Sequence, residues 1–189
     1  MERGTDFLRA QINNAVMQHQ TFLTALEDHQ KQAEDPRFRD LCARFAPMMQ
    51  AHQQTLEQYQ ESIGAKTGGA KKMLGKALGV ARDLADATRE SDFLRLVGDI
   101  VMARQAEDTF KTFREAGRVL NDAELTRIGE HGERGHDEYV KAANRLVQQM
   151  FVEHIREVDP GTVTAAEFER TGARATGTGG LGTTDEFRA

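Results

Sequence analysis

NDAELTRIGEHGERGHDEYVKAANRLVQQM, residues 121–150, carries the clearest structural signal of this sequence. Its core-type positions recur every three or four residues, which is the period of a helix that turns one face to a core. They are Leu125, Ile128, Gly132, His136, Tyr139, Ala143, Leu146 and Met150. Asn121 and Glu124 have the spacing of a capping box, and Asp159-Pro160-Gly161 stops a helix. The sequence therefore predicts one long amphipathic helix between these two signals.

A second helix of the same kind precedes this one. Ser91 is suited to be its N-cap, and the apolar stripe runs up to Gly117. The stripe consists of Phe93, Val97, Ile100, Glu107, Phe110 and Phe113. The short connection between the two helices predicts a hairpin.

The N-terminal third of the chain predicts another helix hairpin. From Thr5 to about Ala33 the core-type positions are Leu8, Ile12, Ala15, His19, Phe22, Leu26 and His29. Asp35-Pro36 then supplies an N-cap and a proline at the first helical position. The next stripe reads Phe38, Leu41, Phe45, Met48, His52, Leu56, Tyr59 and Ile63. Pro47 lies inside this helix and predicts a local bend, since proline removes one backbone hydrogen bond.

The link between the hairpins and the C-terminal segment have a different composition. Gly64, Gly68 and Gly69 interrupt the pattern, and residues 70–87 resume it as a short helix with a solvated lysine face. Residues 159–189 are rich in Gly and Thr and predict a flexible tail. The expected fold is an all-α antiparallel four-helix bundle, residues 1–158, with a long crossover that contains a short helix.

Composition limits the possible functions. The 189 residues carry 25 Lys and Arg against 30 Asp and Glu, a net charge of −5, and these charges alternate in sign. Nucleic acid is therefore not an expected partner, because phosphate binding needs clustered cations. No apolar run is long enough to span a membrane, and a lone Cys42 forms no internal disulfide, so we expect a cytoplasmic protein. Nucleotide-binding and hydrolase motifs are absent from the sequence, and whether the chain is an enzyme stays open.

Five polar residues stand on the predicted apolar stripes or beside them, where an unpaired polar group costs roughly 1–3 kcal/mol. They are His19, His52, Glu107, Glu133 and His136. Glu133 and His136 form Glu-x-x-His, which places a carboxylate and an imidazole on one helical face. Counting residues from the two expected turns places all five at about the same mid-helix level. Three imidazoles and two carboxylates at one level predict a site for iron, manganese or zinc.

With these residues the sequence resembles the ferritin-like superfamily, whose di-metal members place one Glu on each of two helices and Glu-x-x-His on each of the other two. The resemblance covers about residues 5–155. It equates Glu107 with the single Glu of the third helix, and Glu133 with His136 with the motif of the fourth. The resemblance implies a metal-binding bundle protein with a stress-related role.

The first two helices depart from the family pattern. His52 matches the histidine of the second helix, but Met49 stands where the family has Glu. The first helix offers His19, or else Gln18 or Gln20, and no Glu at that level. Two of the four expected carboxylates are therefore missing, which argues against a bridged di-iron centre.

Other interpretations stay open at this point. The five polar residues can form a buried hydrogen-bond network without metal, in a helical interaction protein that has lost the site. A homodimer is expected in either case, and the tail is a possible segment for a protein partner. Gly129, Gly132 and Gly135 indicate either close approach of a neighbouring helix or space left for a ligand, and close packing is favoured.

Overall fold

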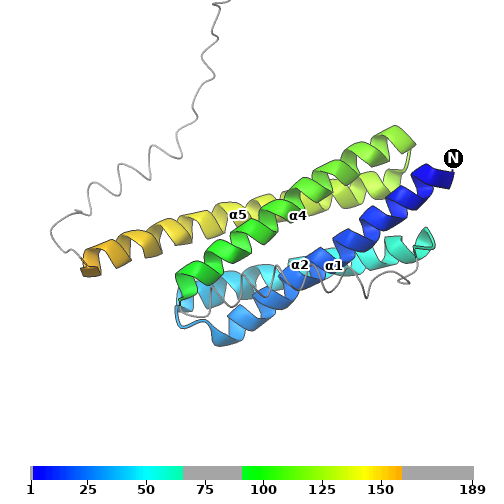
Figure 1. The fold of residues 1–189 in the computed structure, drawn as a ribbon. Coiled ribbons are helices and arrows are strands. Elements are labelled where there is room, and N and C mark those ends of the chain that lie inside the picture. Colours follow the sequence, from blue (N-terminus) through cyan, green and yellow to red (C-terminus); the bar gives the residue numbers. More distant parts are fainter. Residues whose placement is uncertain (1, 66–90, 159–189) are drawn as a thin grey trace, which may run out of the picture. The chain divides into compact units, whose positions relative to one another are not determined.

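The protein is described by a computed structural model at residues 2–65 and 91–158, which form four α-helices and no strand (Figure 1). The helices are α1 (Glu2–Gln32), α2 (Pro36–Ser62), α4 (Asp92–Leu120) and α5 (Ala123–Val158). The all-α prediction is confirmed for these residues. The helix expected within residues 70–87 and the tail expected at 159–189 lie outside the described residues.

The chain divides by its internal contacts into two compact units, Met1–Gln148 and Gln149–Ala189, and the division falls within α5. The contacts and the site described below belong to the first unit. None of the four described helices is both long enough and apolar enough to cross a membrane.

Helices α1 and α2 lie side by side and contact each other along their lengths (Figure 1). Near the start of α1, the Arg9 side chain donates to the carbonyl of Ile63, with 2.9 Å between Nε and O. Asn13 accepts from the amide of Gln60 at 2.7 Å. The turn between the helices is closed as predicted, because the Asp35 side chain accepts from the backbone N–H of Arg37 at 2.8 Å. Helix α2 then continues through Pro47.

The connection between α4 and α5 differs from the prediction. Asn121 does not open a helix; it ends α4 in the left-handed conformation, with φ 55° and ψ 37°. Asp122 caps α5 instead, because its Oδ1 accepts from the N–H of Leu125 at 2.9 Å. Its other oxygen, Oδ2, accepts from the Tyr59 hydroxyl at 2.8 Å and ties the turn to α2. The predicted inward stripe reaches the buried Gly117, and the helix itself continues to Leu120.

The predicted face of α5 is buried from Leu125 to Leu146, as its stripe indicated. Helix α4 follows its prediction only in its second half, where Glu107, Phe110 and Phe113 are buried. In its first half Val97 is 36% exposed, and the buried face instead contains Leu96 and Asp99, both at 0%. The helix turns a charged residue inward here, which an apolar pattern does not indicate.

Candidate metal centre

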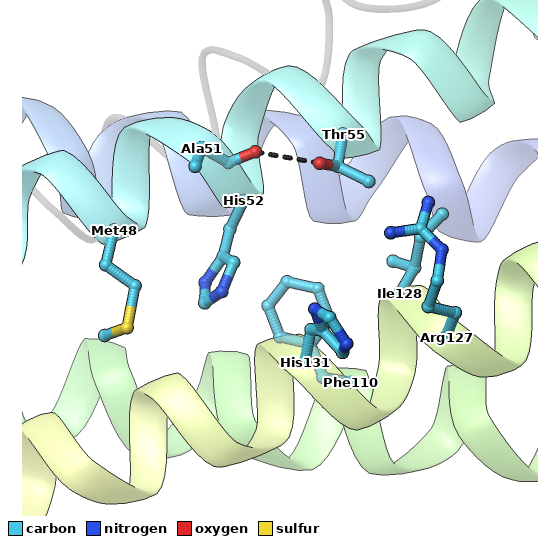
Figure 2. Close-up of a pocket in the computed structure, with 8 residues that line it drawn as sticks. All are labelled: Met48, Ala51, His52, Thr55, Phe110, Arg127, Ile128 and His131. Atoms are coloured by element: carbon cyan, nitrogen blue, oxygen red, sulfur yellow. Dashed lines mark hydrogen bonds between the residues drawn. The ribbon is translucent and has the colours of Figure 1, made fainter.

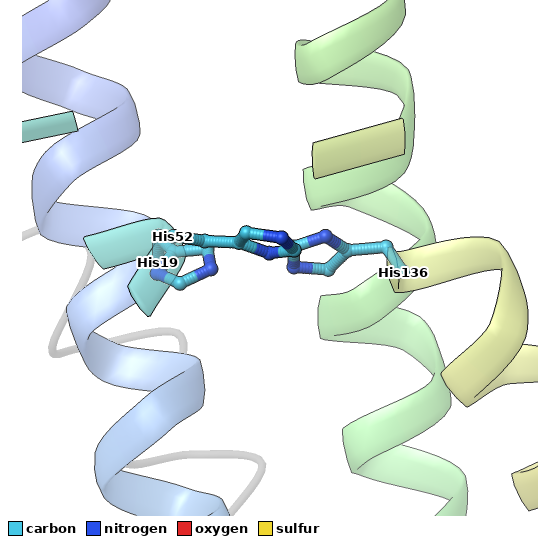
Figure 3. Close-up of side chains that lie close together, drawn as sticks. All are labelled: His19, His52 and His136. Atoms are coloured by element: carbon cyan, nitrogen blue, oxygen red, sulfur yellow. The ribbon is translucent and has the colours of Figure 1, made fainter. Parts of the chain in front are cut away.

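Three imidazoles from three helices meet in the interior. His19 comes from α1, His52 from α2 and His136 from α5, and Figure 3 shows the three rings directed toward one another. One ring nitrogen of each histidine lies within 4.8 Å of a ring nitrogen of both others. The ring centroids are 5.1 Å apart for His19 and His136, 5.7 Å for His52 and His136, and 6.2 Å for His19 and His52. We call these residues the three-histidine cluster.

The orientation of His19 is set by a chain of hydrogen bonds. Its Nδ1 lies 2.9 Å from Oε1 of the buried Gln53. The amide nitrogen of Gln53 donates to the carbonyl of Val16 at 3.3 Å and to the carboxylate of Glu57 at 2.7 Å. Because that nitrogen is used twice as a donor, the amide oxygen faces His19 and accepts the Nδ1 proton. The Nε2 of His19 therefore carries a free lone pair.

His136 is held in the same tautomer by its own helix. Its Nδ1 donates to the backbone carbonyl of Gly132 at 2.7 Å, since a carbonyl oxygen only accepts. Among the described residues, His136 Nε2, His19 Nε2 and His52 Nδ1 are buried nitrogens without a hydrogen-bond partner. Buried polar atoms are nearly always paired, so three unpaired nitrogens in one cluster are an exception to the usual pattern. Histidines that bind metal are typically fixed in this way through the other ring nitrogen.

The protein keeps these imidazoles neutral. Burial lowers the pKa of His19 from its ordinary 6.5 to about 4, and the hydrogen bond with Gln53 opposes this shift. Burial also lowers the pKa of His52 to about 4, with smaller effects from His19 and His131. The pKa of His136 is well below its usual value, again mainly because of burial. At neutral pH the three imidazoles are therefore in the unprotonated form that metal binding requires.

Aromatic rings surround the cluster. The Phe110 ring from α4 lies 5.1 Å from His136, 5.8 Å from His19 and 6.1 Å from His52 between centroids. Phe22 packs against His136 at 5.7 Å. Such an apolar shell limits water access and strengthens the attraction between ligands and a cation.

The two carboxylates predicted for the site have other partners. Glu107 is buried, and its two oxygens bind Arg104 at 2.8 Å and Lys111 at 2.7 Å. Glu133 pairs with Arg114 of α4. The structure therefore gathers His19, His52 and His136 from the five predicted residues and does not group Glu107 or Glu133 with them.

The glycines beside the motif allow close packing of the helices. A Cβ atom at Gly129 would lie 2.3 Å from the backbone nitrogen of Arg114, and one at Gly132 would lie 2.2 Å from the Phe110 ring. A Cβ at Gly135 would lie 2.4 Å from Cε1 of His52. The favoured interpretation, close approach of a neighbouring helix, describes Gly129, which meets the backbone of α4, whereas Gly132 and Gly135 meet side chains of neighbouring helices. At Gly135 the neighbouring group belongs to the cluster itself.

A second buried polar group was missed by the sequence analysis. Asp99 of α4 is fully buried, and its Oδ2 accepts from Tyr139 at 3.4 Å and lies 2.9 Å from Nδ1 of the half-buried His29. Burial raises the pKa of this carboxyl group. Burial, with the nearby charge of Asp99, also raises the pKa of the Cys42 thiol, which makes it unreactive. The only sequence signal was an acidic residue three positions after Leu96 on the same helical face.

The described part of the chain is thus an all-α protein with a buried three-histidine cluster. Neither the family models nor the curated proteins nor the solved structures gave a match to this chain. Its function must therefore be inferred from the cluster and its surroundings.

Proposed function

We propose that this chain is a metal-binding protein in which His19, His52 and His136 hold one divalent transition-metal ion. The observation that carries the proposal is the convergence of three imidazoles, with one ring nitrogen of each within 4.8 Å of the others and one buried, unpaired nitrogen on each ring. Bonds of about 2.0–2.1 Å to a common ion bring ligand nitrogens to roughly 3.4 Å from one another. Small movements of the three rings are enough to reach that spacing.

The donor set favours zinc over the other metals considered. Three neutral nitrogens suit zinc, copper, iron or nickel, whereas manganese prefers oxygen ligands. Three histidines with a free fourth position are a known ligand set of catalytic zinc. A bridged pair of iron ions is disfavoured, because Glu107 and Glu133, the carboxylates available to bridge them, are paired with cations. Iron as a single ion remains the alternative metal.

The proposed fold is an antiparallel four-helix bundle of the ferritin-like kind. Its support is the pairing of the start of α1 with the end of α2, and the ion pairs Arg114–Glu133 and Arg118–Glu130 across the α4–α5 hairpin. The positions of His52 and His136 in the cluster support this proposal, because the resemblance expects histidine ligands at these two positions. We propose that the chain keeps the position of that centre but binds a single ion with histidines alone.

Metal analysis tests this function directly. Protein purified without chelator or affinity tag is loaded with zinc, or anaerobically with ferrous iron, and its metal content is measured by mass spectrometry. We expect one ion per chain, lost in His19→Gln and in His136→Gln and retained in Glu107→Gln and Glu133→Gln. Circular dichroism checks that each variant is folded.

Each result has a clear meaning. Loss of metal in Glu133→Gln would mean that this carboxylate takes part in metal binding. It would favour the five-residue site predicted from the sequence. A wild-type protein without metal would contradict the proposal and favour a metal-free interaction protein. That second function has some support in the exposed apolar residues Leu94, Val97 and Val101, which follow one face of α4.

Gly135→Ala is expected to weaken metal binding at least tenfold without unfolding the protein. The added methyl group would meet Cε1 of His52 at 2.4 Å, and the imidazole must move away because the backbone of α5 is fixed. Changes to the groups that orient a metal ligand typically cost about 10–100-fold in metal affinity. Competition with a zinc-binding dye measures the change. Gly4→Ala is the matched control, since nothing lies within 4 Å of its added Cβ, and an equal loss in this control would contradict the expectation.

A further inference from the structure

A methionine thioether lies beside the three-histidine cluster. Met48 and His52 are four residues apart on α2, and this spacing places both side chains on one face of the helix. They also line the same pocket, which has a volume of about 180 Å³ (Figure 2). Met48 is half-buried there, so its side chain is not enclosed by the core. A sulfur atom therefore lies on the His52 side of the cluster.

Gly135 shows how close this sulfur lies to the imidazole of His52. A Cβ atom at Gly135 would lie 2.4 Å from Cε1 of His52 and 3.1 Å from Sδ of Met48. The two groups thus border the same point on α5, at the residue that directly precedes the cluster residue His136. A methionine side chain has three rotatable bonds, so its sulfur can move a short distance toward the cluster without a change in the backbone.

The donor atoms of the cluster carry no charge. Three neutral imidazoles supply no negative charge to a bound ion, and the carboxylates of Glu107 and Glu133 are paired with cations. The cost of moving an ion from water into an apolar interior grows with the square of its charge. Neutral ligands therefore hold a monovalent ion at a lower desolvation cost than a divalent one.

The chemistry of the sulfur indicates which monovalent ion this is. A thioether is a soft ligand that selects copper(I), and imidazole nitrogens also bind copper. Zinc takes thiolate, imidazole or carboxylate ligands instead. Met48 therefore offers a ligand that suits copper(I) and does not suit zinc.

Resting on the proposed function, we infer that Met48 supplies the fourth ligand of the site through its sulfur, and that the completed site holds copper(I) as well as a divalent ion. His19, His52 and His136 bind either metal through their nitrogens, whereas the sulfur binds copper(I) alone. Met48 is then the residue that determines which metals the site accepts.

Copper(I) binding by the full chain tests this inference. The ion is supplied without oxygen and competes with bicinchoninate, a chelator that is coloured when it holds copper(I), while a zinc-binding dye measures zinc affinity. We expect Met48→Leu, which nearly conserves side-chain volume, to weaken copper(I) binding at least about tenfold, the lower end of the range for changes near a metal ligand. Its zinc affinity should equal that of the wild type. Met150→Leu is the matched control, because this half-buried methionine lies outside the unit that contains the cluster.

X-ray absorption at the copper edge provides a second readout. In the wild type we expect a sulfur atom in the coordination shell of copper, together with the imidazole nitrogens. In Met48→Leu the sulfur should be absent and the nitrogens retained.

The outcomes separate this inference from the proposed metal site. Weaker copper(I) binding in Met48→Leu, with unchanged zinc affinity and an unaffected Met150→Leu, would support the inference. Equal copper(I) affinity in Met48→Leu and the wild type would overturn it. An equal loss of zinc and copper(I) in Met48→Leu would also overturn it, because Met48 would then have only a structural role. The metal site would stand in both cases if the wild type binds zinc, whereas a wild type that binds neither metal would overturn the site and the inference together.

Discussion

Replacing Gly129 with alanine is expected to destabilise the protein by at least about 2 kcal/mol, although alanine is the better helix former by roughly 1 kcal/mol. The new methyl group would lie 2.3 Å from the backbone nitrogen of Arg114 and 2.6 Å from its Cα. Backbone atoms of a neighbouring helix cannot rotate away as a side chain can. Helices α4 and α5 must separate, and the packing on both sides of the contact is lost.

Urea unfolding measures this effect through the transition midpoint, provided that the slope of the transition is unchanged. Gly4→Ala in α1 is again the matched control, and its stability should be equal to or slightly above that of the wild type, since its added Cβ meets no atom within 4 Å. If Gly129→Ala were as stable as this control, helices α4 and α5 would not approach each other as closely as described here.

Acid is expected to destabilise the metal-free protein well before ordinary carboxylates are protonated. The pKa values of His19 and His52 are lowered from 6.5 to about 4 in the folded state. Between these values the unfolded chain binds more protons than the folded one, so stability falls as the pH drops from about 6.5 to 4. The loss is on the order of 3 kcal/mol for His19 alone. At neutral pH this penalty is absent.

Urea unfolding in the presence of a chelator, repeated between pH 7 and pH 5, tests the effect of acid. His19→Gln removes one of the titrating groups, so its stability should depend less steeply on pH than that of the wild type. His154→Gln is the control, because this exposed histidine lies outside the unit that contains the cluster, and the variant should follow the wild type. If His19→Gln kept the full pH dependence of the wild type, the imidazole of His19 would not be buried in its neutral form.

The fold could be predicted where apolar periodicity is strong. The stripe of α5 and the Asp35-Pro36 start of α2 are correct because burial and capping depend on local residue order. The residue that caps α5 could not be predicted in this way, since Asn121 and Asp122 are both good capping residues. The structure selects Asp122, whose second oxygen also accepts from Tyr59. That partner is distant in the sequence, so local order does not indicate it.

The grouping of the three histidines could be predicted from the sequence, whereas the partners of the two carboxylates could not. The five residues lie at about the same height along the helix axes, but this height does not determine which neighbour each side chain binds. Glu107 and Glu133 have cationic partners, among them Lys111 on the same helix and Arg114 on the facing one. Gln53, which orients His19, lies one position after His52 and carries no sequence signal of its own. Whether metal occupies the cluster remains a prediction.

The three histidines come from α1, α2 and α5 and are far apart in the sequence. With Cys42 as its single cysteine, the chain has no internal disulfide to restrict its unfolded state. An ion bound to His19, His52 and His136 would link positions far apart in the sequence and act as a removable cross-link. A chelator would then open this link as a reductant opens a disulfide, and the heat resistance of the protein would follow the supply of metal.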